Sequence, residues 1–456
     1  MGLLSASKSS RAKSGGSAFF IAIFLFILVV SAALLFYVNE REQPTITPSP
    51  LPQLIGALTD FHFEAADKKS GLRHVQVSVI QGDKSVSVVD KIFPRRGWIG
   101  QAGPREMVSA VSLDTVKLGL ADGPAEVIIY ARDYSYWRFG VGNENQIIVP
   151  VEFDTKPPRV SRLESPRYIK QGGAGIVLYR MSEEAPRHGV SVNDYFHPGF
   201  PVEGKKDVYG AMIALPYDTA KITDAHVLAE DSAGNQGKAP FGMIVKKRAL
   251  KKDTINIPDS FLDLKIPEFS QYYPEMTGTK VEQYLYVNNT VRQENNVKFR
   301  ELCSHPLPEK LWHGRFGRMP GAGRASFADH RTYMYKGKKI DQQVHLGNDI
   351  ASVRHAPVEA ANEGKVIYAD YRGIYGNTVV LDHGTGVFSL YSHMSQIAVA
   401  PGDIVKKKGV LGATGTSGMA GGDHLHFSML VNGIMVDPLE WWDASWLDLH
   451  IESYLK

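Results

Sequence analysis

The stretch AFFIAIFLFILVVSAALLFYV, residues 18–38, contains no charged side chain. In a helix that rises 1.5 Å per residue, its length matches a bilayer hydrocarbon core of roughly 30 Å. The preceding residues, 1–17, carry three basic side chains and no acid, so the positive-inside rule places them in the cytoplasm. We therefore predict a cytoplasmic tail over 1–17 and a transmembrane helix over 18–38. The protein is then a single-pass protein of the cytoplasmic (inner) membrane, with all later domains in the periplasm or wall zone.

A cleaved signal peptide is the alternative for this stretch, with Val30-Ser31-Ala32 as a small-residue cleavage site. The bulk of the chain is exported under either interpretation. The single cysteine, Cys303, excludes an internal disulfide and a cysteine-rich zinc site. The formal net charge of +3 is weak for 456 residues, so the composition indicates no nucleic-acid partner. Any metal site must be built from histidines and carboxylates.

Two β-rich domains are predicted after the apolar stretch. Residues 39–54 are rich in proline and predict an extended linker. Alternating or β-branched runs between Gly and Asp turns then predict strands over 55–155 and again over 156–250. Both blocks place an Ala-x-Asp after a strand, so that Asp133 and Asp231 occupy equivalent positions of a weak internal repeat. The blocks resemble bacterial immunoglobulin-like domains and predict tandem β-sandwiches, to which we assign no chemistry.

The second half of the chain predicts a helical segment followed by a return to strands. Residues 251–305 predict a helical connector, because 279–302 is polar, lacks Pro and Gly, and has only a thin apolar face. Glycine content and strand patterns rise again in 306–443, and 444–456 is a C-terminal tail. The predicted fold class is therefore mainly β.

Histidines and one aspartate recur in the last third of the chain. VHLGNDIA contains His345 and Asp349, SLYSHMS contains His393, and DHLHF contains His424 and His426. Side chains two apart on a strand point to the same face, so the last two imidazoles can enter one cleft. The apolar residues on either side of the second imidazole then face a core. A catalytic zinc takes three protein ligands and leaves one position for water. The spacing alone does not decide which histidines are ligands and which are acid–base groups.

Residues 306–443 resemble the lysostaphin-type (LytM-like) zinc endopeptidases of bacterial cell walls. The resemblance rests on HLGNDIA, APVEAANEGKVIYA, YGNTVVLDHGTGVFSLYSHMS, VAPGDIVKKKGVLGATGTSG and DHLHFSMLVNGIMVDP, which follow one another in the family's order. It implies an antiparallel β-sheet that binds one Zn²⁺ through His345, Asp349 and His426. It further implies that His393 and His424 are catalytic. The turn GTSGMAGGDHLHF is longer than is usual in the family, which leaves the substrate preference open.

These observations predict a membrane-anchored zinc metalloendopeptidase that hydrolyses peptide bonds in peptidoglycan stem peptides or cross-links. Its partners are then the peptidoglycan and, through residues 18–38, the membrane. One alternative is a non-cleaving, peptidoglycan-binding activator or regulator of another wall hydrolase. A second is a structural or adhesive surface protein in which the β-sandwiches carry the function. We also hypothesise that the connector gates the active site, since a wall hydrolase must not dissolve its own cell.

Overall fold

The computed structural model describes residues 15–98 and 100–456, and it is mostly β with an apolar helix near the N-terminus. Helix α1 (Gly15–Val38) includes Phe19–Val38, which is long and apolar enough to cross a membrane. The predicted cytoplasmic tail lies almost entirely outside the described residues. The chain divides into two compact units, one ending at Lys156 and containing Ser232–Asn235, the other formed by Pro157–Asp231 and Gln236–Lys456.

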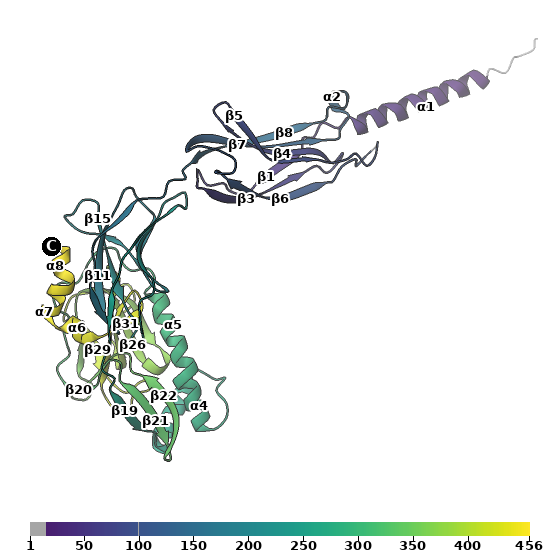
Figure 1. Cartoon of the computed structure of the whole chain (residues 1–456). Helices are drawn as coiled ribbons and strands as arrows, with labels where there is room; N and C mark the ends of the chain where they lie inside the picture. Colours follow the sequence, from purple (N-terminus) through teal and green to yellow (C-terminus); the bar gives the residue numbers. More distant parts are fainter. Residues whose placement is uncertain (1–14, 99) are drawn as a thin grey trace, which may run out of the picture. The chain divides into compact units, whose positions relative to one another are not determined.

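In the first unit, two sheets enclose one apolar core (Figure 1). Along β4 the valines Val75, Val77 and Val79 alternate with less buried residues and are fully buried, which is the pattern of a strand with one face in a core. A short helix, α2 (Trp137–Gly140), precedes the last strand. The smaller sheet has the order β1 (Thr45–Pro48), β3 (Leu58–Ala66), β6 (Glu106–Asp114), and the larger has the order β2 (Leu54–Ile55), β8 (Glu144–Phe153), β7 (Gly123–Asp133), β4 (Leu72–Gln81), β5 (Lys84–Ile92).

The second unit begins with a further pair of sheets, each of four strands, around a core of its own. One has the order β14 (Phe200–Pro201), β15 (Val208–Ala214), β11 (Ala174–Met181), β9 (Val160–Glu164), and the other β13 (Tyr195–Pro198), β12 (Arg187–Val192), β16 (Ala225–Glu230), β17 (Gln236–Pro240). A parallel pair, β10 (Tyr168–Lys170) and β18 (Ile244–Lys246), leads toward the C-terminal half.

The segment predicted as a helical connector begins as a strand. β19 (Lys252–Asn256) forms a small sheet with β21 (His330–Tyr335) and β22 (Lys338–Val344). The helices that follow are α3 (Asp259–Ser270), α4 (Lys280–Tyr286), a π-helical turn η1 (Val287–Val291) and α5 (Arg292–Leu302). Thr279 and Glu282 form a capping box that starts α4. Part of this thin apolar face is buried, because Val291 and Phe299 belong to the same buried cluster as Leu390 of the C-terminal sheet, whereas Val297 is exposed.

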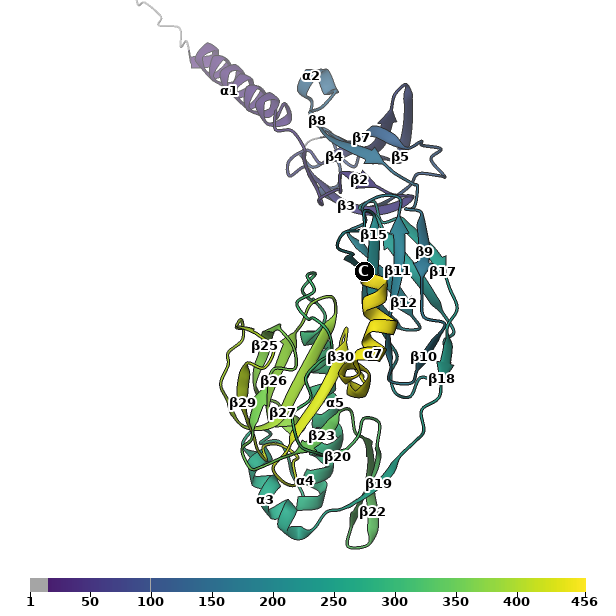
Figure 2. The ribbon, with the colours of Figure 1, turned by 90° about the vertical axis from the view of Figure 1, so that its left-hand side faces the viewer.

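The C-terminal half is built on a sheet of ten strands, whose central strands lie side by side in Figure 2. Its main path is β20 (Ala322–Ala325), β23 (Asn348–Ala351), β30 (Leu425–Val431), β27 (Val387–Ile397), β26 (Asn377–Asp382), β25 (Gly364–Tyr371), β28 (Ile404–Val405). Three further strands join it: β24 (Pro357–Glu359), β29 (Val410–Thr414) and β31 (Ile434–Val436). The remaining helical elements are η2 (Gly373–Tyr375), α6 (Pro438–Trp442), α7 (Ala444–Leu447), η3 (Asp448–Glu452) and α8 (Ser453–Leu455).

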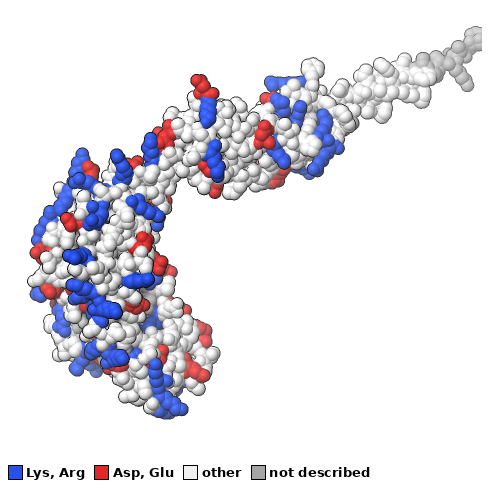
Figure 3. All heavy atoms as spheres, in the orientation of Figure 1, with Lys and Arg blue, Asp and Glu red and all other residues white. Residues whose placement is uncertain are grey.

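The sheets of residues 157–250 and the C-terminal sheet share one hydrophobic core. Ile176 and Met212 belong to the same buried cluster as Leu381 and Val431. A salt bridge of 2.5 Å between Arg248 and Asp437 joins the same two parts. An isolated C-terminal fragment would expose this apolar surface, so biochemical work is best done on the whole chain. Figure 3 shows basic and acidic side chains intermixed over the visible face, as the weak net charge suggests.

Candidate metal centre and active site

Neighbouring strands of the C-terminal sheet bring the candidate residues together. Asp349 on β23 lies directly opposite His426 on β30 in an antiparallel register. His424 precedes β30 and forms an isolated bridge with Gly415. Leu425 and Phe427 are buried in the hydrophobic core, as the alternation predicts. The strand period therefore separates the apolar residues from the imidazoles.

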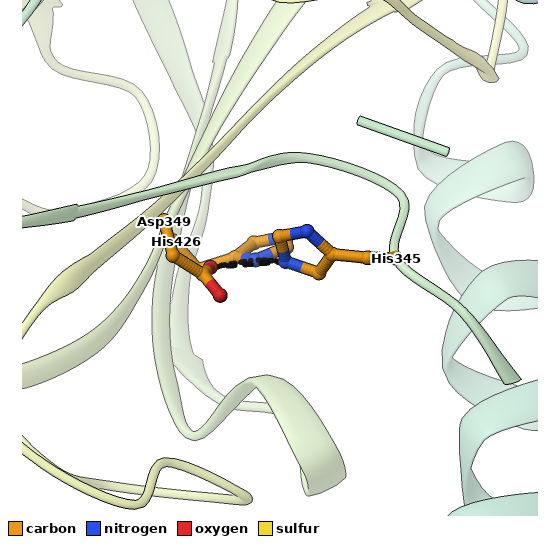
Figure 4. Close-up of side chains that lie close together, drawn as sticks. All are labelled: His345, Asp349 and His426. Carbon is orange, nitrogen blue, oxygen red and sulfur yellow. Dashed lines mark hydrogen bonds and ion pairs between the residues drawn. The ribbon is translucent and has the colours of Figure 1, made fainter. Parts of the chain in front are cut away.

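Three side chains converge on one point (Figure 4). The distance from His345 Nε2 to Asp349 Oδ1 is 3.0 Å, and that from His426 Nδ1 to the same oxygen is 2.9 Å. The two imidazole nitrogens are 3.0 Å apart. In the figure His345 enters from the side opposite to the other two residues. All three side chains are buried.

The second nitrogen of each of these two histidines is held by an acceptor. His345 Nδ1 donates to the carbonyl oxygen of Ser326 at 3.0 Å. His426 Nε2 donates to the hydroxyl of Ser428 at 3.0 Å, and this hydroxyl donates to the carbonyl oxygen of Leu346 at 2.8 Å. These bonds leave one lone pair on each ring at the point of convergence, which is how proteins orient histidine ligands. Burial lowers the pKa of His426 to about 4, so the ring is neutral.

Asp349 has a charged partner that the sequence analysis missed. Its Oδ2 accepts a hydrogen bond of 2.9 Å from Nη2 of Arg331, which lies on β21 and is largely buried. Burial alone would raise the pKa of Asp349, but the neighbouring histidines, His345 first, hold this pKa well below its ordinary value. The carboxylate is therefore ionised and fixed on both oxygens. No spacing in the sequence relates Arg331 to Asp349.

His393 is aimed at the cluster by an irregularity in β27. Its φ is +63°, a value that residues other than glycine seldom adopt, and the pairing of β27 with β26 shifts register beside it. The ring centroids of His393 and His426 are 5.7 Å apart. His393 Nδ1 donates to the carbonyl oxygen of Ser417 at 2.8 Å, which leaves Nε2 as the acceptor. Burial above all, with the two nearby histidines, lowers the pKa of His393 well below its ordinary value.

His424 lies next to His393 and reaches the edge of the cluster. Its Nε2 is 3.6 Å from Asp349 Oδ1, and its Nδ1 donates to the carbonyl oxygen of Gly422 at 2.7 Å. Burial lowers the pKa of His424, but the close contact with the charged carboxylate of Asp349 outweighs burial and leaves this pKa raised. Asp423, which directly precedes His424, accepts hydrogen bonds from Thr414 and from the backbone of His355.

The donor set fits a zinc ion. Two neutral imidazole nitrogens and one carboxylate oxygen are ligands that Zn²⁺ takes in catalytic sites, with a fourth position left for water. Atoms that stand 2.9–3.0 Å apart can all reach one ion at about 2.0–2.2 Å. His393 and His424 lie outside this triangle but beside it.

The candidate site opens into a cavity of about 650 Å³, and the segment 251–305 forms part of its wall. Phe261 and Leu264 of α3 line this cavity together with the histidines. Lys265 donates to the carbonyl oxygen of Thr416, and Glu268 accepts a hydrogen bond of 2.6 Å from the amide of Gly418. Helix α3 is thus bonded to the loop that precedes His424. The supposed connector contributes directly to the shape of the cleft.

The comparisons with known proteins first identify the class. Residues 343–438 match the model of Peptidase family M23, and this part of the chain is an M23 (LytM-like) peptidase domain. DD-carboxypeptidase/endopeptidase Mpg of Neisseria meningitidis is 36% identical over 97 residues, which are 21% of this chain and 22% of that protein. Peptidoglycan DD-endopeptidase ShyB of Vibrio cholerae is 34% identical over 116 residues, 25% of this chain and 26% of that protein.

Among solved structures, a putative M23 peptidase from Pseudomonas aeruginosa is similar, with a TM-score of 0.38 and 21% identity over 60% of this chain and 94% of that chain. The segment matched to the curated relatives spans about a quarter or less of their length. The family match at residues 343–438 covers the segment that carries Asp349, His393 and His426.

Proposed function

We propose that this protein is a membrane-anchored zinc metalloendopeptidase that cleaves peptide bonds in peptidoglycan, outside the cytoplasmic membrane. The observation that carries the proposal is the triangle of His345 Nε2, Asp349 Oδ1 and His426 Nδ1, with every other nitrogen of its histidines held by an acceptor. The names of the relatives, DD-endopeptidases of peptidoglycan, support the substrate class. Helix α1 supports the anchor.

In this proposal the ligands are His345, Asp349 and His426. A bound zinc supplies an acidified water and polarises the scissile carbonyl. The protein's own residues do the rest. His393 and His424 both have Nδ1 occupied by a carbonyl oxygen, so each presents Nε2 to the site. The neutral ring of His393 can accept a proton there, and His424, whose pKa Asp349 raises, can donate one to a developing oxyanion. Arg331 holds the carboxylate of Asp349 in place.

The test is to measure the zinc content and the peptidoglycan hydrolysis of the detergent-purified whole chain beside His426→Ala. We expect about one zinc per chain and release of wall peptides from the wild type, and neither from the variant. The exposed His313, in the same domain, provides a matched control, since His313→Ala leaves every contact of the cluster in place. A wild type that holds zinc but cuts no wall preparation would contradict the proposal and favour the non-cleaving activator.

A further inference from the structure

A second group of ionisable side chains is buried in the first unit, away from the proposed active site. Glu40 lies two residues after α1, Asp67 directly follows β3, and Asp133 is the last residue of β7. Their side-chain oxygens lie within 4.8 Å of one another, and the residues are only 9%, 4% and 0% exposed. Asp133 is also the residue that the internal repeat places after a strand. We call these three residues the acidic cluster.

No Lys or Arg forms an ion pair with the acidic cluster among the described residues. No Lys or Arg nitrogen lies within 4.0 Å of its oxygens there; Lys69, nearby in sequence, pairs with Glu42 instead. The hydrogen bonds come from neutral donors: the hydroxyl of Ser70 to Glu40 Oε1 at 3.1 Å, and the side-chain amide of Asn143 to Asp133 Oδ2 at 2.8 Å. Buried carboxylates without a counter-charge are strongly unfavourable, so this arrangement calls for a cation.

One oxygen of the acidic cluster has no hydrogen bond at all. Oε2 of Glu40 is buried and lacks a partner in the described part of the chain, whereas nearly all buried polar atoms have one. Burial, reinforced by the charges of Asp67 and Asp133, raises the pKa of Glu40 to about 7. The same three groups that repel one another when empty would all be satisfied by a single positive ion.

We propose that the acidic cluster binds one Ca²⁺ ion through Glu40, Asp67 and Asp133. Its donors are all oxygens, which suits a hard cation and disfavours zinc, which prefers nitrogen or sulfur. Ca²⁺–oxygen distances are about 2.3–2.6 Å, so ligands on opposite sides of the ion stand about 5 Å apart, which accommodates the 4.8 Å limit of this group. Mg²⁺ needs a tighter octahedron of about 2.0–2.1 Å. Water completes the coordination.

The ion would connect three segments that are distant in sequence. It would tie the residues that follow α1 to the turn between β3 and β4 and to the end of β7. A hydrogen bond between two of these segments is already present, because the Ser135 hydroxyl donates to the main-chain carbonyl oxygen of Glu40 at 2.7 Å. Calcium would thus fix the exit of the anchor helix to the first β-unit. This role is structural and does not depend on the proposed hydrolysis.

The experiment is equilibrium dialysis of radioactive Ca²⁺ against the detergent-purified whole chain with its zinc present. We compare the wild type with Glu40→Gln, which has almost the same shape, and with the control Glu42→Gln, an exposed glutamate two residues away. We expect one more bound Ca²⁺ in the wild type and in the control than in Glu40→Gln. Excess Mg²⁺ should displace it poorly. Equal binding by all three chains, no binding by the wild type, or displacement by equimolar Mg²⁺ would overturn the proposal.

A thermal measurement separates calcium binding from a role of the Glu40 side chain in packing alone. At a Ca²⁺ concentration a hundredfold above its Kd, the melting temperature of the first unit should rise on the order of 5 °C in the wild type and not in Glu40→Gln. In the presence of a chelator, Glu40→Gln should melt at a higher temperature than the wild type, because the variant removes one uncompensated charge. If Glu40→Gln fails to fold, Asp133→Asn replaces it, since the asparagine oxygen still accepts from the backbone amide of Asn143. A lower melting temperature of the variant in both conditions would contradict calcium binding.

Discussion

The His–Asp–His triangle of the C-terminal sheet and the acidic cluster of the first unit both bury carboxylates, but they compensate them differently. In the triangle, Asp349 has the guanidinium of Arg331 on one oxygen and imidazoles on the other. In the acidic cluster, Glu40 and its two partners have only neutral donors. In the first site the protein itself therefore compensates the charge of the carboxylate, whereas in the second the charges of the carboxylates are compensated only when a cation is bound.

This difference separates two uses of a metal. A catalytic ion must be held by ligands that keep their geometry while other groups react, and hydrogen bonds to carbonyl oxygens and to Ser428 provide that order in the triangle. A structural ion instead supplies the free energy that holds segments together. Nitrogen donors with one carboxylate suit zinc, and oxygen donors alone suit calcium.

Exchanging the metals should produce the largest effect. We expect a chelator that removes the metal ions from the whole chain to lower the rate of peptidoglycan hydrolysis by about a thousandfold or more. The reason is that a zinc ion contributes several kcal/mol of transition-state stabilisation. Zn²⁺ should restore the hydrolysis and Ca²⁺ should not, whereas Ca²⁺ should restore the melting temperature of the first unit. Wall-digestion rates and calorimetry on the same samples check both. Hydrolysis restored by Ca²⁺ alone would erase the distinction between the sites.

Ser428→Ala should weaken the order of the triangle without touching a ligand atom. The variant removes the acceptor of His426 Nε2–H, so the ring loses its fixed orientation. Outer partners of histidine ligands contribute about 10–100-fold to metal affinity, and we expect a loss in that range in a zinc competition titration. Ser445→Ala, at an exposed serine of the same half, is the control. Unchanged affinity would mean that strand geometry alone orients His426.

Arg331→Gln should make Asp349 resemble the acidic cluster. With the buried cation removed, we expect the metal-free protein to lose roughly 3 kcal/mol of unfolding free energy. Zinc should recover much of this loss, because the ion then becomes the carboxylate's counter-charge. Denaturation with and without zinc measures the difference, with Arg324→Gln, an exposed arginine, as control. The idea fails if zinc stabilises the variant no more than it stabilises the wild type.

Glu268→Ala tests whether the wall formed by α3 restricts access, and we expect the smallest effect here. The variant removes the acceptor of the Gly418 amide and the partner of Lys265, which loosens the loop before His424. Hydrolysis of intact peptidoglycan should rise about threefold, equivalent to about 0.7 kcal/mol, while that of a short soluble peptide stays constant. Glu301→Ala, on the exposed face of α5, serves as control. Equal changes on both substrates would exclude a gate.

The sequence alone predicted the apolar N-terminal helix and the mainly β character, and it supplied the five residues of the candidate active site. These patterns are local, or they rest on the resemblance of the last third of the chain to one family. The alternation of His424 and His426 with Leu425 and Phe427 needs only the period of a strand. The packing of the connector, residues 251–305, was harder to predict from the sequence, because its apolar residues are few and their partners lie on another element.

Only the tertiary structure decided which polar groups meet. Arg331 on β21 reaches Asp349 on β23 although the two strands belong to different sheets, and no spacing predicts that contact. Glu40, Asp67 and Asp133 look like three ordinary surface acids in the sequence, separated by 27 and 66 residues. They become a candidate ion site because folding removes them from water together. Burial and charge compensation are properties of neighbours in space, and a single sequence lists neighbours only along the chain.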